Sequence, residues 1–187
     1  GVASRGDPII APDDARGLKV RGGSREMDML LQNAGATVVN MPSNEIYNAL
    51  RSGALDAALT SSTSLISFRL QETARSLTTA RAGSYWFMFE PLLMSRTVFE
   101  RLTKAQQQAV MTVGADLEKF AMNSARMDDA EVATVYRGVG ARVVDLNPDA
   151  LRGWQEVARN TAWKDFAARN SNCAKLMALA EQSIAAI

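Results

Sequence analysis

The sequence contains no histidine, and this sets the firmest limit on its chemistry. Histidine is the usual general base of catalytic triads and the commonest metal ligand in proteins. Cys173 is the single cysteine, so the chain can form neither an internal disulfide nor a zinc site of ordinary ligand spacing. No pair of carboxylates stands apart from the solvated charges. We therefore predict that the protein is not an enzyme and that it holds no metal and no cofactor.

The sequence also has very little net charge and no long apolar run. The 21 basic and 20 acidic residues nearly cancel, so no broad field exists to attract nucleic acid. The most apolar stretch, 85–94, is interrupted by Glu90 and Pro91, and it falls short of the roughly 20 apolar residues of a membrane-spanning helix. We therefore expect no nucleic-acid partner. A chain of 187 residues that is 47% hydrophobic can still build one large or two small packed domains.

Short apolar runs alternate with amphipathic segments in the first half of the chain. The runs lie at 18–21, 37–41 and 55–60, and each is too short to be a buried helix. Ser24 and Ser43 are expected to cap the helices that follow, and Gly35 and Gly53 to end them in the left-handed conformation. Consecutive βα units in one sheet cross over with a right hand. The pattern therefore predicts an α/β fold, a three-layer lobe with a parallel sheet.

The second half of the chain has a different character. We expect a fourth strand at 75–79 and a strand with both faces buried within 85–94. A helix that Thr103 caps should reach about Arg137. We then expect a short strand at 142–146, a helix opening at Asn147-Pro148, and a last helix over about 173–187. The long helix is too long for a small βα unit. It therefore indicates a part of the molecule that is built differently from the first three units.

Polar side chains follow each of the three predicted strands. Arg21 and Ser24 follow the first, Ser43 the second, and Thr60 with Ser61 the third. In open parallel sheets the ligand lies beyond the carboxyl ends of the strands. An arginine fork can hold a carboxylate by two parallel bonds, and the adjacent Gly22-Gly23 pair lets the backbone approach closely. The pattern predicts a site for an organic anion.

Each of these residues also has a structural interpretation. The serines can serve only as helix caps, and the glycine pair only as a tight turn. Arg21 can reach solvent or pair with Glu26 or Glu45. The aromatic cluster that contains Trp86 can be plain core packing, which is the interpretation we give to Trp154 and Trp163.

A succession of short motifs runs through much of the chain. It includes Pro8-Ile9, Gly17-Leu18-Lys19-Val20-Arg21, Gly35-Ala36, Met41-Pro42, Glu45-Ile46-Tyr47-Asn48-Ala49-Leu50 and Gly53-Ala54-Leu55-Asp56. In order and spacing this string resembles the periplasmic solute-binding proteins of TRAP transporters, the DctP-type family. The resemblance implies a two-lobed receptor of the type II periplasmic-binding-protein-like fold. Such a receptor closes on a small carboxylate in the periplasm and delivers it to a membrane permease.

The resemblance also implies roles for individual residues. Arg21 falls on the family arginine that grips the carboxylate. Ser24, Ser43 and Thr60 match places that line the pocket, with Ser61 beside them and Trp86 in the segment that crosses between the lobes. The chain departs from the family pattern at Ala57, where glycine is common, and at 60–64, which replaces the asparagine-containing segment of sialic-acid receptors. The substrate of those receptors therefore does not transfer.

The family pattern places most of a first lobe before Pro8, so the resemblance implies a chain that lacks roughly the N-terminal third to half. On that basis we assign 1–84 to the second, ligand-binding lobe, 85–102 to a crossing segment and strand of the first lobe, and 103–187 to elements that brace both lobes. No leader resembling a signal peptide opens the sequence. Apolar faces without their partners would favour self-association.

Other functions fit the same pattern. An effector-binding domain of a transcription regulator uses a similar two-lobed design, and a truncated fragment of a receptor need no longer bind a ligand. A small enzyme on this fold is the third alternative. The substrate itself cannot be named from these residues.

Overall fold

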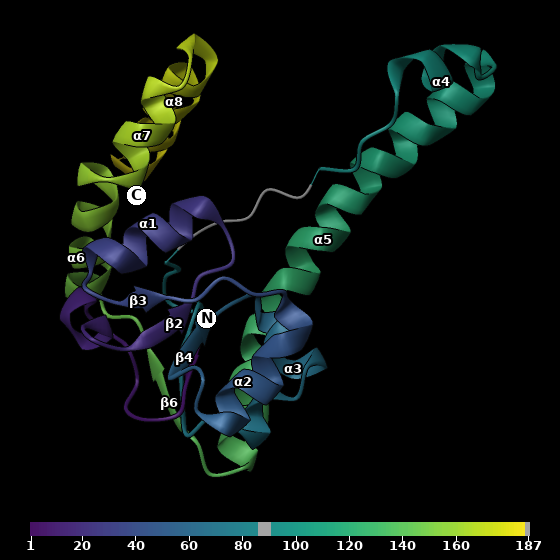
Figure 1. Cartoon of the computed structure of the whole chain (residues 1–187). Helices are drawn as coiled ribbons and strands as arrows, with labels where there is room; N and C mark the ends of the chain where they lie inside the picture. The colour runs from purple at the N-terminus through teal and green to yellow at the C-terminus, as the bar shows by residue number, and fades with distance from the viewer. Residues whose placement is uncertain (86–90, 186–187) are drawn as a thin grey trace.

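The computed structural model describes residues 1–85 and 91–185, and the strands in these ranges form one mixed sheet (Figure 1). The strands are β1 (Val2–Ser4), β2 (Lys19–Arg21), β3 (Thr37–Val38), β4 (Ala57–Leu59), β5 (Ser76–Thr79) and β6 (Arg142–Asp145), in the spatial order β3-β2-β4-β1-β5-β6. The pairs β2–β3, β2–β4 and β5–β6 are parallel. The predicted α/β fold is confirmed.

The sheet departs from the expected all-parallel arrangement at β1. This strand lies between β4 and β5 and runs antiparallel to both, with Val2 opposite Leu59 on one side and Thr78 on the other. Val2 and Ala3 are buried. A strand of three residues is too short to show a periodic pattern, so no pattern in the sequence indicates it. The centre of the sheet was therefore not predicted.

Helices cover both faces of the sheet, which confirms the three-layer architecture. On one face α1 (Arg25–Asn33) and α6 (Pro148–Asn160) pack on Val20 and Leu59, with Trp154 in the core. On the other face α2 (Ile46–Ser52), α3 (Ser62–Ser67) and the last turns of the long helix α5 (Lys104–Gly138) surround Leu77. Short 3-10 turns at Pro12–Ala15 (η1), Ser43–Glu45 (η2) and Leu70–Glu72 (η3) complete the connections.

Most of the predicted helix boundaries have the expected caps. The Ser24 hydroxyl accepts a hydrogen bond from the Met27 N–H at 3.3 Å, and Gly35 and Gly53 adopt positive φ values of 89° and 82°. The prediction that Ser43 caps a helix was wrong. Pro42 precedes the η2 turn and Ser43 is its first residue, so the Ser43 hydroxyl is one position too late to cap it, and no side-chain cap forms there.

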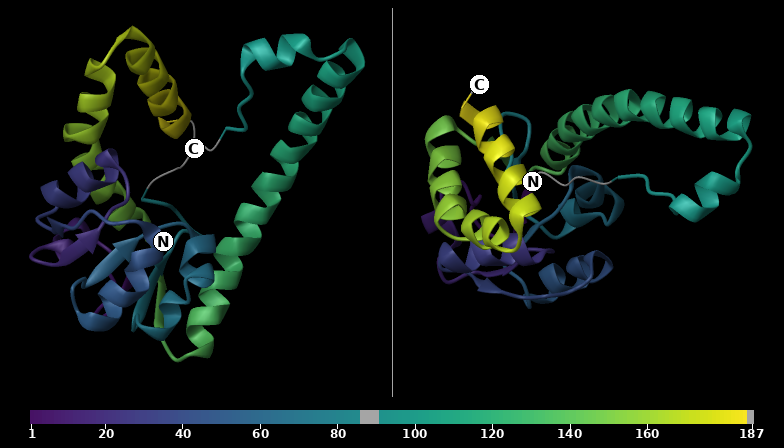
Figure 2. Two further views of the ribbon diagram at one scale, coloured as in Figure 1. Left: turned by 45° about the vertical axis from the view of Figure 1, so that its right-hand side comes forward. Right: turned by 90° about the horizontal axis from the view of Figure 1, so that it is seen from above.

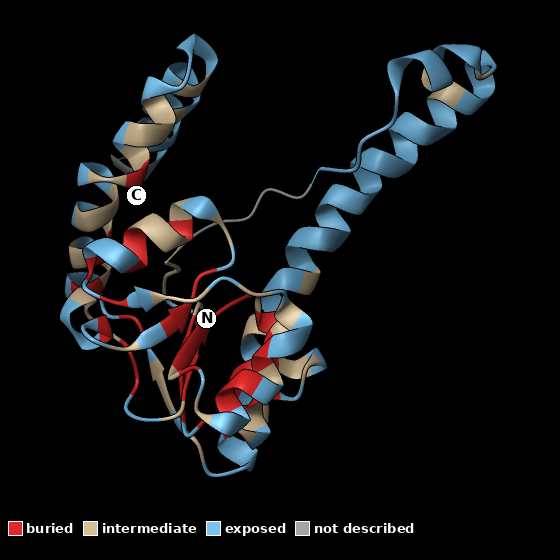
Figure 3. Ribbon diagram, in the orientation of Figure 1, coloured by how far each residue is buried: buried red, intermediate tan, exposed pale blue. Residues whose placement is uncertain are grey.

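The long helix α5 (Lys104–Gly138) projects far beyond the sheet, and α4 (Arg96–Arg101) lies at its far end (Figures 1 and 2). It begins as predicted, because Thr103 and Gln106 form a reciprocal capping box. Val132, Ala133 and Tyr136 near its C-terminal end are buried against the sheet. Figure 3 shows that most of the rest of the helix is exposed.

The buried strand expected within 85–94 is not present in the part of it that the structure describes. Residues 86–90 lie outside the described ranges, and 91–94 form no strand. Leu92 and Leu93 are 84% and 82% exposed. Apolar side chains are buried only where another element covers them, and none of the described elements covers these two.

The C-terminal segment continues the sheet and then leaves it. β6 pairs with β5, and Asn147 caps α6 as expected by accepting a hydrogen bond from the Ala150 N–H at 2.8 Å. α7 (Ala162–Ala168) and α8 (Ser171–Ala185) then pack on each other. Arg169, directly after α7, contacts Glu26 on α1 at 2.5 Å. No helix in the described ranges is long and apolar enough to cross a membrane.

Candidate anion-binding site

The three strands that carry the predicted site residues are neighbours in the sheet. The order β3-β2-β4 places the carboxyl end of β2 between the ends of the other two strands. Arg21 is the last residue of β2 and is only 9% exposed. Its Nε–H donates to the Met41 carbonyl and its Nη1–H to the Leu59 carbonyl, each at 3.2 Å. The guanidinium thus bridges the chain beyond β3 and the end of β4, and it joins all three strand ends.

This geometry excludes two structural interpretations of Arg21, namely solvent exposure and an ion pair with Glu26. The side chain does not extend into bulk water, and Glu26, one of its two expected acidic partners, contacts Arg169 instead. Among the described residues, no carboxylate forms an ion pair with Arg21. The guanidinium therefore keeps its positive charge without direct neutralisation, in a mostly buried position.

The Gly22-Gly23 turn lies against this guanidinium. Gly23 has a φ of +103°, and a Cβ atom there would be 2.4 Å from Nη1 and 2.6 Å from Cζ of Arg21. A Cβ atom on Gly22 would lie 2.1 Å from Oδ1 of Asp28. No side chain can occupy these positions without displacing Arg21 or Asp28. The glycines therefore bring the backbone close to the Arg21 and Asp28 side chains, and its close approach to a ligand stays a prediction.

Asp28, in the first turns of α1, is the charged neighbour that sequence reasoning missed. Its Oδ1 atom is buried and has no hydrogen-bond partner in the described part of the chain. Burial raises the pKa of Asp28, whereas a hydrogen bond from the Gly23 backbone and the charge of Arg21 act in the opposite direction. Burial lowers the pKa of Arg21, and the Asp28 charge opposes that shift. The two groups therefore interact through their charges across the glycine turn.

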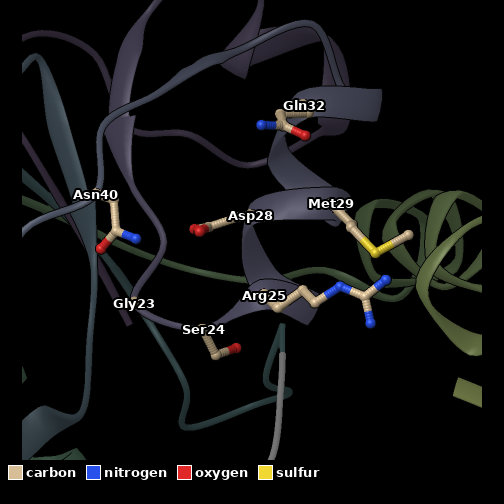
Figure 4. Close-up of a pocket in the computed structure, with 7 residues that line it drawn as sticks. All are labelled: Gly23, Ser24, Arg25, Asp28, Met29, Gln32 and Asn40. Carbon is tan, nitrogen blue, oxygen red and sulfur yellow. The ribbon is translucent and has the colours of Figure 1, made fainter. Parts of the chain in front are cut away.

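A pocket of about 440 Å³ adjoins the turn on the side of α1 (Figure 4). Its lining comes from α1, from the turn before it and from the end of the β3 segment, and consists of Gly23, Ser24, Arg25, Asp28, Met29, Gln32 and Asn40. In Figure 4 the Asp28 carboxylate points from α1 toward Asn40. The Arg25 side chain contacts Asp165 at 2.8 Å. Arg21 does not line this pocket, which lies beside the guanidinium rather than over it.

The other predicted site residues occupy different positions. Ser24 caps α1 and lines the pocket. Thr60 is buried, and its backbone N–H donates to the Gly1 carbonyl at 3.1 Å. Ser61 caps α3, where its hydroxyl accepts from the Ser64 N–H at 3.1 Å. Ser43 opens the η2 turn and is half-buried, while Trp86 lies outside the described residues.

Two hydroxyls next to Ser61 tie the β4 end to the long helix. Ser62 donates to Asp129 at 2.5 Å and Thr63 to Asp128 at 2.6 Å. Both aspartates belong to the part of α5 that reaches the sheet. The residues after β4 are therefore fixed to α5 as well as to the sheet. No group of three or more candidate metal-ligating side chains occurs within residues 1–85 and 91–185.

Comparisons with known sequences all match the chain to solute-binding proteins. The sequence matches the family model described as bacterial extracellular solute-binding protein, family 7, over residues 2–170. A solute-binding protein of Albidiferax ferrireducens is 60% identical over 184 residues, which are 98% of this chain and 54% of that protein. The C4-dicarboxylate-binding periplasmic protein DctP of Rhodobacter capsulatus is 20% identical over 158 residues, 83% of this chain and 46% of that protein. The chain thus spans about half the length of these curated relatives.

A solved structure shows the same backbone arrangement. The crystal structure of a TRAP periplasmic solute-binding protein from Rhodoferax ferrireducens, with bound malonate, is similar to this chain with a TM-score of 0.92 at 60% identity. The similarity covers 99% of this chain and 58% of that one.

Proposed function

Since the chain belongs to bacterial extracellular solute-binding protein family 7, we propose that it acts as a periplasmic receptor for a small organic carboxylate. The receptor delivers this ligand, chemically unchanged, to the membrane permease of a TRAP-type secondary transporter. The observation that carries the proposal is the position of Arg21, whose guanidinium joins three adjacent strand ends and forms no ion pair with a carboxylate among the described residues.

The contacts of Arg21 suit it to hold an anion. A guanidinium has five N–H donors in a fixed plane, and the Met41 and Leu59 carbonyls take two of them. These two bonds fix the plane of the group before any ligand arrives, so less side-chain entropy is lost on binding. The mostly buried position strengthens attraction to a carboxylate relative to a site in bulk water.

A small organic carboxylate is the ligand class that we propose, and malonate is the probe that tests it. The similar receptor from Rhodoferax ferrireducens was crystallised with malonate, and it shares 60% of its residues with this chain. One carboxylate of such a ligand would bind Arg21 in a charge-assisted, bidentate manner. Ser24, Ser43, Thr60, Ser61 and Trp86 are proposed to line the rest of the site.

We also propose the two-lobed organisation. Residues 1–84 would form one lobe, 85–102 a crossing segment of the other lobe, and 103–187 elements that brace both. The exposed apolar side chains on the projecting part of α5 support this division, because they suit a helix whose face is covered by further protein.

Titration calorimetry of the full-length protein with malonate tests the function. We expect Arg21→Ala to weaken binding by about 30-fold or more, since removing one partner of a buried charged pair costs about 2 kcal/mol or more. Arg16→Ala is the matched control, because Arg16 is exposed and pairs with Asp13 at a helix start. Its affinity should equal that of the wild type.

Two results would overturn the proposal. One is a wild-type protein that binds neither malonate nor any other acid of a carboxylate panel. The other is an Arg21→Ala variant that folds and binds as tightly as the wild type, which would show that the anion lies elsewhere.

A further inference from the structure

The Gly22-Gly23 turn has a charged group on each side. On one side Gly23 touches the guanidinium of Arg21, as the 2.4 Å separation between its virtual Cβ and Nη1 shows. On the other side, a Cβ atom built on Gly22 would lie 2.1 Å from Oδ1 of Asp28, so the Gly22 backbone is next to this oxygen. Two opposite charges are therefore held close together, with only the backbone of two glycines between them. They form no direct ion pair, so the carboxylate does not take up any guanidinium donor.

From this arrangement we propose that Asp28 is a specificity-determining residue, which limits the negative charge that the Arg21 site accepts. The inference rests on the proposed function, because it assumes that a ligand carboxylate binds Arg21. The buried Asp28 oxygen adds a negative potential across the glycine turn from the guanidinium. A ligand with one carboxylate meets a compensating positive charge at Arg21, whereas a second anionic group on the ligand is also repelled by Asp28.

The other charged residues near the turn are already paired, so we assign this role to Asp28. Glu26 and Arg25, on the same helix, are engaged by Arg169 and Asp165 respectively. The other polar groups that line the adjoining pocket, from Ser24, Gln32 and Asn40, are neutral. Among the described residues, Asp28 is also the acidic side chain whose charge acts on Arg21.

A pair of ligands that differ by one charge tests the role of Asp28. Malonate and its half-amide, malonamate, have nearly the same size, but the half-amide lacks one carboxylate. The measured quantity is the ratio of their affinities for the full-length protein. Asp28→Asn keeps an acceptor oxygen for the Gly23 N–H and removes the charge. We expect it to raise the ratio in favour of malonate by about threefold to tenfold.

Two further variants separate charge from shape. Asp28→Ser removes the same charge with a shorter side chain and should shift the ratio in the same direction. Asp13→Asn, at an exposed position, removes a charge far from Arg21 and should leave the ratio unchanged. Thermal unfolding should show that both Asp28 variants are folded and at least as stable as the wild type, because a partly desolvated carboxylate has been removed.

The outcomes also distinguish this inference from the proposed function. If the wild type binds malonate through Arg21 but neither Asp28 variant raises the ratio, the role of Asp28 is refuted and the receptor function stands. If the wild type binds neither probe nor any other acid of the carboxylate panel, both proposals fall. A ratio that rises in both Asp28 variants and not in Asp13→Asn supports the charge-limiting role.

Discussion

Arg21 is held by backbone carbonyls rather than by an acidic side chain, and this difference determines what it can do. The Arg169 guanidinium contacts both Glu26 and Asp165, which neutralise it. The Met41 and Leu59 carbonyls orient Arg21 and carry only partial charge. A buried cation that is oriented but not neutralised favours an anionic ligand.

At the same scale, we predict that Gly23→Ala damages both stability and binding. The positive φ of 103° is unfavourable for alanine, and the new methyl group would meet the Arg21 guanidinium. We expect a loss of about 1–3 kcal/mol in the free energy of unfolding, measured by urea denaturation, with weaker malonate binding. Gly6→Ala is the control, since nothing lies within 4 Å of its virtual Cβ. Equal stability of the Gly23 variant and the control would contradict the geometry of the turn.

The positions of some candidate site residues could be predicted from the sequence and others could not. Arg21 was predicted because an arginine at the end of a buried strand, followed by two glycines, is a local pattern. The Ser43 cap was wrong because the η2 turn begins at Ser43 itself, which leaves Pro42 in the capping position. Asp28 was missed because its proximity to Arg21 depends on the path of the glycine turn, and no periodic pattern in the sequence indicates that path.

At the scale of elements, the ends of β5 and β6 are joined through one carboxylate. Asp145 accepts hydrogen bonds from the Thr79 hydroxyl and from Arg81, whose Nη2 lies 2.9 Å from Oδ2. The hydrogen bond from Thr79, followed by that from Arg81, lowers the pKa of Asp145 below its ordinary value of 3.8. The ionised carboxylate therefore stabilises the folded state.

This shift gives a pH-dependent prediction. A lowered carboxylate pKa contributes stability that is fully present well above pH 3.8 and is lost as the pH falls through the folded-state pKa. Urea denaturation of Asp145→Asn should therefore show a less stable protein than the wild type at pH 6, and a smaller difference at pH 3. A difference of the same size at both pH values would contradict the assigned contacts.

The elements themselves were predictable in proportion to their length and pattern. The α5 helix, with its capping box, and the α6 helix, with its Asn147 cap, were found near their true starts. The β3 strand is shorter than the apolar run at 37–41 suggested, because only Thr37 and Val38 pair with β2. The β1 strand was missed because its place in the sheet depends on pairing with residues far along the chain, Leu59 and Thr78.

At the scale of the whole molecule, the chain exposes many apolar side chains. Side chains that normally lie in a core are exposed along 92–127, among them Leu93 (82%), Phe120 (67%) and Met127 (70%). Figure 3 shows that most of α4 and of the projecting part of α5 is exposed. An apolar surface of this kind promotes association in water.

We therefore predict that the 187-residue chain self-associates. Light scattering over a range of protein concentrations should show an average mass that increases above that of the monomer. Replacing Met111 and Phe120, which are 62% and 67% exposed, with serine should shift the protein toward the monomer. A clean monomer at every concentration, in a chain that binds no dye specific for apolar surfaces, would contradict the prediction.

A crystal structure of the full-length protein grown with malonate tests the central claim most directly. The account predicts one carboxylate of malonate in a bidentate contact with Arg21, at the roughly 2.7–2.9 Å typical of charge-assisted bonds, while the Met41 and Leu59 carbonyls keep their bonds to the same guanidinium. Malonate bound with both carboxylates out of contact with Arg21 would contradict it.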